Sequence, residues 1–418
     1  MTELGVYVHV PFCRHRCDYC AFATYTDRDA LMARYVASCV EELGRAVSSG
    51  ELPAATSVFF GGGTPSRLPA PWLARILAAV PLAPGAEVTV ECNPEDASPD
   101  RLAAYRDAGV TRMSFGVQST APHVLVSLGR RHDPESVPRA VEAASSAGFS
   151  RVNVDLIYGA AAETDRDWAR TVDDVLSLPH PPGHVSAYAL TVEPGTPLSR
   201  DPPRHPDDDV QAARYELVDA KLAAAGYLWE EVSNWARPGE GCRHNQLYWR
   251  QGDYVGIGSA AHSHRGDARS GRRWWNVRTP ERYVAAVEEG RPPVAGEEVV
   301  GGERRAFERL MLSLRTPEGV PDWALPDTGE LDGLVVREGG RAVLTVRGRL
   351  LANAVSSLLR APLAGAASRQ QPGQQSGQPV GAAARAAVGA AVRAAVWAGV
   401  GDAVEDTVGD AVGDAVGD

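Results

Sequence analysis

The sequence contains almost no lysine. Lys221 is the only lysine among 42 basic residues. So uniform a preference for arginine indicates a bias in the composition of the whole sequence and not a functional site. The formal net charge is −11 at neutral pH. This charge argues against a general nucleic-acid binder, because contacts to phosphate groups need a basic surface. We therefore expect no nucleic-acid partner.

Long apolar runs are also missing. No stretch of about 18 consecutive apolar residues occurs, so we expect no transmembrane span. The first residues, MTELGVYVHVPF, lack the basic start and apolar core of a secretory signal peptide. The expected location is therefore the cytoplasm, where disulfides are rare, and the 6 cysteines are predicted to be unpaired.

The first half of the chain alternates short β-branched or aromatic runs with helical patterns. Six runs are predicted as strands: 5–10, 57–60, 87–91, 111–115, 151–157 and 184–190. Successive βα units predict a parallel sheet with helices outside, as an open sheet or a partial barrel. Unusual residues follow the end of each predicted strand, which indicates one site at the carboxyl ends of the strands.

The second half divides by composition. We predict a core barrel over 1–235, with a helix at 209–226 and a strand at 227–236, and a connecting region over 236–302. Residues 303–360 are predicted to form a small α/β module. Residues 361–418 are rich in Gln, Gly, Ala and Val, which predicts a disordered low-complexity tail with at most a weak helix near 382–398.

Three cysteines, Cys13, Cys17 and Cys20, follow the first predicted strand in the pattern C-x3-C-x2-C. Soft thiolates select iron–sulfur clusters or zinc, and His15 could complete a zinc site. A four-iron cluster held by three cysteines leaves one iron open, and S-adenosylmethionine (SAM) can chelate that iron. The missing fourth ligand is then the cofactor itself.

Further residues suit such a cofactor. The glycines of FFGGGTPS permit a close backbone approach. Counter-charges and hydrogen bonds for its amino-acid and ribose groups could come from Glu91, Gln118, Arg130 and Asp155.

With these motifs the sequence resembles the radical SAM superfamily, and more narrowly the oxygen-independent coproporphyrinogen III oxidase family. The shared stretches are YVHVPFCRHRCDYC, FFGGGTPS, ECNPE, SFGVQS, LGRRH, NVDLIYG and YALTVEPGTPL. The resemblance implies an α/β fold, a partial (βα)6 TIM-like barrel with a smaller C-terminal α/β module, and a 4Fe-4S cluster on Cys13, Cys17 and Cys20. It also implies a set of SAM contacts: Tyr7, Tyr19, Gly62, Gly63, Thr64, Glu91, Gln118, Arg130, Asp155 and Ala189.

The family has two branches with different functions. The oxidases carry a further cysteine after the third and a long N-terminal extension, whereas this sequence has Phe22 at that position and a short N-terminus. Both features resemble the haem-chaperone branch, HemW. That branch implies binding of haem and its transfer to apo-haemoproteins such as respiratory enzymes. The alternative is oxidative decarboxylation of coproporphyrinogen III. No catalytic residue is assigned, and whether the chain is an enzyme stays open.

HemW chains share a motif H-N-x-x-Y-W that is thought to contact haem. Here it is His244, Asn245, Tyr248 and Trp249, with Cys242, His262 and His264 as further candidates. Residue chemistry alone favours a hydrogen-bonding role for His244, and the resemblance shifts the balance toward haem contact. One departure from the resemblance is the segment GAAAETDRDW after the fifth strand, where HemW chains have a GLPGQT-like turn.

Overall fold

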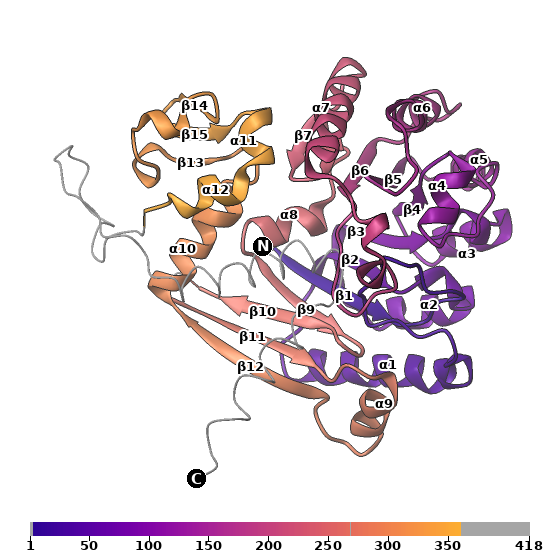
Figure 1. Ribbon diagram of the computed structural model, residues 1–418. Coiled ribbons are helices and arrows are strands. Elements are labelled where there is room, and N and C mark those ends of the chain that lie inside the picture. Colours follow the sequence, from indigo (N-terminus) through magenta and orange to yellow (C-terminus); the bar gives the residue numbers. More distant parts are fainter. Residues whose placement is uncertain (1–2, 268, 361–418) are drawn as a thin grey trace, which may run out of the picture.

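The computed structural model describes residues 3–267 and 269–360 (Figure 1). The predicted low-complexity tail over 361–418, with its weak helix near 382–398, lies outside the described residues. In the described ranges no helix combines the length and the apolar character needed to cross a bilayer.

Six parallel strands form the centre of the structure, adjacent in the order of the sequence. They are β1 (Leu4–Val10), β2 (Ala55–Gly62), β3 (Leu82–Cys92), β4 (Arg112–Gln118), β5 (Arg151–Tyr158) and β6 (His184–Ala189). Each overlaps a predicted strand, so the α/β prediction is confirmed. Their β-branched and aromatic side chains suit a sheet that is buried on both faces.

Helices cover the outer side of these strands (Figure 1). They are α1 (Met32–Ser48), α2 (Ala70–Ala78), α3 (Pro99–Asp107), α4 (Pro122–Ser127), α5 (Ser136–Ser146), α6 (Asp165–Leu176) and α7 (Asp208–Ala224). In α1 the residues Tyr35, Cys39 and Leu43 are fully buried against the sheet. Their spacing of four places them on one helical face.

The sheet continues past the six parallel strands at both ends. Beyond β1 it adds β9 (Asp253–Ile257), parallel to β1, and then the antiparallel strands β10 (His262–Gly266), β11 (Ser270–Asn276) and β12 (Val294–Gly301). Beyond β6 it adds β8 (Asn234–Ala236) and β7 (Leu228–Glu231). The order ends at β12 and β7, so the barrel is partial.

The prediction of one strand over 227–236 was wrong. The chain turns back at Val232 and Ser233, so β7 and β8 form an antiparallel hairpin with Trp229 opposite Trp235. Burial drives the turn, because folding back places Trp235 in the core at 0% exposure while Trp229 stays partly covered.

Two helices, α8 (Arg243–Trp249) and α9 (Pro280–Glu288), complete the sheet region.

A separate C-terminal module follows the sheet region. It contains α10 (Gly302–Ser313), β13 (Val320–Pro321), β14 (Val335–Glu338), β15 (Arg341–Leu344), α11 (Val346–Leu350) and α12 (Ala352–Ser357). The module has its own apolar core between Phe307 and Leu359. It is tied to the barrel by Arg349, which pairs with Asp219 at 2.8 Å and stacks over Trp229.

Candidate functional site

The cysteine loop begins where β1 ends, at the carboxyl end of the parallel strands. Its base is closed by backbone hydrogen bonds, from the amide of Cys13 to the carbonyl of Tyr25 at 3.0 Å and from the amide of Tyr25 to Pro11 at 2.8 Å. The three cysteines are therefore held at the end of the sheet on which parallel α/β proteins build their sites.

All six cysteines of the chain are free, so the prediction of unpaired thiols is confirmed. The hydroxyl of Thr64 donates to Cys13 Sγ at 3.5 Å, and Arg130 Nη1 donates to Cys17 Sγ at 3.7 Å. Burial raises the pKa of Cys13, and it raises the pKa of Cys20 to about 12. Buried thiols of this kind ionise when a metal centre supplies positive charge.

The cysteines do not form a site for one ion. Within residues 3–267 and 269–360, no three His, Cys, Asp or Glu side chains converge as a single metal ion requires. His15 is exposed and contacts Arg131. A tetrahedral zinc site of three cysteines and His15 is therefore not preformed, whereas a cluster with several irons does not need its ligands to meet at one point.

The glycine loop after β2 packs directly against the base of the cysteine loop. Gly62 has φ +104°, and a Cβ atom there would lie 2.5 Å from the ring of His9. A Cβ atom on Gly63 would lie 2.8 Å from the carbonyl oxygen of Val10. Both positions thus require glycine. The amide of Thr64 donates to Phe12 at 2.9 Å, which fixes the two loops together.

Two carboxyl groups, Glu91 of β3 and Asp155 of β5, lie on the same side of the sheet with β4 between them. Asp155 accepts hydrogen bonds from Ser114 at 3.1 Å and Asn153 at 2.9 Å. Burial raises the pKa of both groups, and the charge of Asp155 raises that of Glu91 further. A cationic ligand would offset this repulsion, as the sulfonium group of SAM would do.

A second polar group gathers around Gly116 at the end of β4. Arg130 Nη2 donates to the carbonyl of Gly116 at 2.8 Å and to Asn93 Oδ1 at 2.9 Å, and the Gln118 amide lies against the same glycine. Gln118 has φ +65°, and its buried Oε1 has no hydrogen-bond partner in the described structure. A buried acceptor without a partner costs stability unless a ligand donates to it.

These observations fit the predicted cofactors. The thiols, the glycine cradle, the paired carboxyl groups and the unsatisfied Gln118 acceptor suit a cluster with SAM beside it. When bound, the cluster supplies an iron with an open position and redox chemistry. Sequence analysis missed Asn93, which orients Arg130, although it lies inside the motif ECNPE.

Three other predicted SAM contacts lie in different surroundings. Tyr7 is buried on β1, with its hydroxyl 3.1 Å from His9 Nδ1 and its ring stacked on Phe59. Tyr19 of the cysteine loop packs on an apolar cluster that includes Leu128. Ala189 ends β6 and pairs with Tyr158 of β5.

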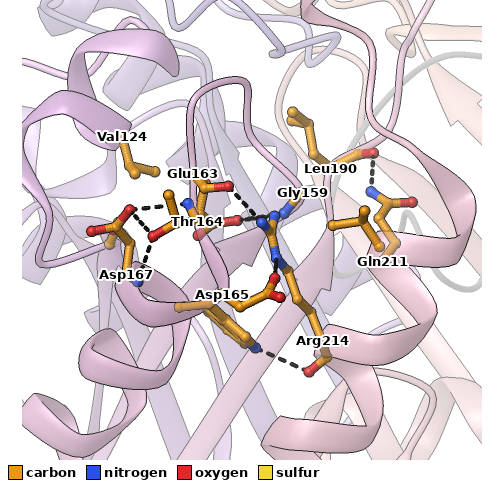
Figure 2. A network of polar contacts seen from close by, with 12 residues as sticks. Val124, Gly159, Glu163, Thr164, Asp165, Asp167, Leu190, Gln211 and Arg214 are labelled. Carbon is orange, nitrogen blue, oxygen red and sulfur yellow. Dashed lines mark hydrogen bonds and ion pairs between the residues drawn. The ribbon is translucent and has the colours of Figure 1, made fainter.

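The segment after β5 that differs from the HemW pattern, GAAAETDRDW, is built around a buried ion pair (Figure 2). Glu163 accepts from Arg214 Nη1 at 2.6 Å and from the amide of Gly159 at 2.7 Å. Arg214 also donates to the carbonyl of Glu163 and, at 3.3 Å, to Asp165. Burial raises the pKa of Glu163 to about 7. The pair holds the 159–164 loop against α7, and Ala160 of this loop joins the cluster that supports Tyr19.

The predicted haem motif lies at the opposite end of the barrel. His244 of α8 is fully buried, with Nδ1 2.9 Å from Ser57 Oγ and Nε2 2.8 Å from the hydroxyl of Tyr248. Its amide donates to Glu87 at 3.2 Å. Ser57 lies early in β2, whereas the cysteine loop follows the end of β1. Binding of haem iron by His244 therefore requires loss of one of these contacts.

The other candidate haem contacts also lie in buried surroundings, except His262. Cys242 and Trp249 are buried, and Asn245 has a buried Oδ1 without a partner in the described structure. His264 is buried with Nδ1 2.8 Å from the carbonyl of Gly252. His262 is exposed and stacks on Trp275.

Comparison with known proteins agrees with this geometry. Residues 7–175 match the radical SAM superfamily. The protein named heme chaperone HemW of Mycobacterium tuberculosis is 45% identical over 84% of this chain and 93% of the relative. HemW of Bacillus subtilis is 31% identical over 84% of this chain and 97% of the relative. The chain belongs to the HemW family of radical SAM proteins.

Membership of the radical SAM superfamily implies a 4Fe-4S cluster and SAM. The chain is also similar in structure to coproporphyrinogen III oxidase (HemN) from Escherichia coli, with a TM-score of 0.71, 23% identity and coverage of 85% of this chain and 89% of the oxidase. At that identity the likeness shows that this chain and the oxidase share a fold. It confirms the predicted partial barrel.

Proposed function

We propose that this protein is a haem chaperone, which binds haem and transfers it to apo-haemoproteins. The observation that carries the proposal is the identity of 45% with a heme chaperone HemW over 93% of that relative's length. The coproporphyrinogen III oxidase alternative has weaker support, since the likeness to that enzyme is one of fold at 23% identity.

In this proposal Cys13, Cys17 and Cys20 hold the cluster. SAM is held between the glycine cradle and the polar groups at the strand ends: Tyr7, Tyr19, Gly62, Gly63, Thr64, Glu91, Gln118, Arg130, Asp155 and Ala189. Recipient haemoproteins such as respiratory enzymes, and a cytoplasmic location, stay predictions. Contact of haem with His244, Asn245, Tyr248 and Trp249 also stays a prediction. Binding of the iron by His244 would require loss of its hydrogen bond with Ser57 or with Tyr248.

The test is an anaerobic haem titration of the cluster-reconstituted protein, followed at the Soret band. It is paired with transfer of the bound haem to apomyoglobin as a generic acceptor. The proposal expects saturable binding near one haem per chain and transfer to the acceptor at a rate above that of free haem. A protein that binds no haem, but converts coproporphyrinogen III when given SAM and a reductant, would show the oxidase alternative to be correct.

A further inference from the structure

Buried polar side chains line the inner side of the parallel sheet. On β5, Val152 and Val154 belong to the apolar core that the helices cover. Asn153 and Asp155 alternate with them and therefore face the inside of the partial barrel. Barrels of parallel strands usually fill this inner side with bulky branched residues. Polar residues at these positions therefore indicate a role beyond packing.

Asn153 connects Asp155 to the neighbouring strand. Its Nδ2 donates to Asp155 Oδ1 at 2.9 Å. Its Oδ1 lies 2.5 Å from Nδ1 of His184, the residue opposite it on β6. The hydroxyls of Ser114 and Ser186, at 2.8 Å and 3.1 Å from Nδ2, can donate or accept and so do not set the orientation of the amide. That orientation is set by Asp155 and His184.

The same series of hydrogen bonds reaches α8. His184 Nε2 lies 2.8 Å from Glu230 Oε2 on β7, and the other oxygen of Glu230 accepts from Nε2 of Gln246. Gln246 lies on α8, within the predicted haem motif that starts at His244. Four successive hydrogen bonds therefore join Asp155 to α8. We call these side chains the inner polar relay.

The protonation state of Asp155 sets the direction of the donors in the relay. An ionised Asp155 only accepts, so Asn153 turns Nδ2 toward it and its Oδ1 accepts from a protonated Nδ1 of His184. A protonated Asp155 allows the reverse arrangement, in which its hydroxyl donates to Oδ1 and Nδ2 donates to an unprotonated Nδ1. Ionisation of Asp155 thus transfers one proton to His184 and reverses the amide between them.

The charge on His184 determines how firmly Glu230 is held. Burial opposes ionisation of Glu230, but hydrogen bonds from His184 and Gln246 and the charge of Arg112 lower its pKa. Glu230 is therefore a carboxylate. A doubly protonated His184 donates to it in a charge-assisted hydrogen bond, which is stronger than a neutral one. Glu230 is then fixed as the acceptor of Gln246.

We propose that Asn153, His184 and Glu230 are positioning residues that link the SAM site to α8, so that binding of SAM tightens the packing of α8. The inference rests on the SAM contacts of the proposed function, which include Asp155. A cation beside Asp155 favours its ionised form, and that form holds the relay in one arrangement up to Gln246. The effect of SAM on α8 and the effect of α8 on SAM must then be equal.

The experiment measures the affinity for SAM by anaerobic titration calorimetry of the cluster-reconstituted protein. Gln246→Met removes the hydrogen bond that is furthest along the relay from Asp155, and we expect the Kd for SAM to rise at least about threefold. Ser57→Ala is the matched control, because it removes another hydrogen bond that holds α8, to His244, and lies outside the relay. Its Kd should equal that of the unmodified protein.

Hydrogen exchange of residues 243–249 gives the reciprocal measurement. SAM should slow exchange at these amides in the unmodified protein and in Ser57→Ala. The slowing should be at least about threefold smaller in Gln246→Met. A residue that only stabilised the fold would change exchange by the same factor with and without SAM. Asn153→Leu removes the donor to Asp155 and should raise the Kd for SAM about tenfold.

Iron and sulfide content is measured for each variant, so that loss of the cluster is not mistaken for loss of the link. If Gln246→Met matches Ser57→Ala in both measurements, the link is overturned and the SAM contacts stand. If the fully loaded unmodified protein binds no SAM, the SAM site of the proposed function fails and the link fails with it. Gln246 is only half-buried, so Gln246→Met tests the link even if Asn153→Leu does not fold.

Discussion

Loss of the Arg214 side chain tests how the 159–164 loop is held. Arg214 is 4% exposed and is the only cationic partner of the buried Glu163 carboxylate among the described residues, at 2.6 Å. Arg214→Met keeps the apolar stem and removes the charge and three hydrogen bonds. The carboxylate must then stay charged without a partner or take up a proton.

The expected cost is large and depends on pH. Removing one partner of a buried ion pair costs about 3–5 kcal/mol. In the unmodified protein burial raises the pKa of Glu163 to about 7, and loss of the Arg214 charge raises it further. A raised folded-state pKa gives stability that is present at low pH and lost as pH rises through that value. The cost of Arg214→Met should therefore be smaller at pH 6 than at pH 8.

Native-state hydrogen exchange of residues 159–176 measures this local stability without unfolding the whole chain. At pH 8 a loss of about 3 kcal/mol corresponds to exchange about a hundredfold faster. Lys221→Met is the matched control, because Lys221 lies on the same helix and pairs with the exposed Asp173, an interaction expected to contribute about 0–1 kcal/mol. Glu163→Gln/Arg214→Met should recover much of the protection. If Arg214→Met exchanges no faster than Lys221→Met, the pair does not hold the loop.

Three further changes probe the site and its support. Cys17→Ser should abolish the brown absorbance of the reconstituted cluster with the circular dichroism spectrum unchanged, and a fully loaded variant would remove Cys17 from the ligand set. Gly62→Ala should cost about 1–3 kcal/mol more than Gly50→Ala, as judged by thermal melting. Both glycines have positive φ, but only Gly62 faces a clash, with His9; equal losses would contradict the steric argument. Burial raises the pKa of Glu42 to about 7, so its contribution to the free energy of unfolding should decline as pH rises from about 4.5 to 7. Glu42→Gln should flatten this decline in thermal melts across the same pH range. An unchanged slope of stability against pH would assign the decline to another group.

Much of the fold could be predicted from the sequence because its signals are local. Each parallel strand is a short β-branched or aromatic run followed by a helical pattern, and the order βα repeated six times leaves few topologies. The hairpin of β7 and β8 was missed because its turn at Val232 and Ser233 contains no Gly, Pro, Asn or Asp, and Ser233 alone is a weak turn signal.

The site was predictable to the extent that its residues lie in motifs at strand ends. The contacts between Thr64 and Cys13 and between Arg130 and Cys17 join segments that the predicted sheet already brings together. The Glu163 and Arg214 pair could not be foreseen, because its members are far apart in the chain, with no spacing that links a loop to a helix.

The placement of α8 separates the predicted haem motif from the cysteine loop, a distance that the sequence did not indicate. His244 and Leu247 pack against Gly5 at the start of β1, while the cysteine loop begins after Val10 at its end. Five residues of strand span about 17 Å, so haem held by His244 and a cluster held by the cysteines would lie at opposite ends of the barrel. α8 packs at the amino-terminal end of the parallel strands, and the hydrogen bonds of His244 with Ser57 and Tyr248 hold it there.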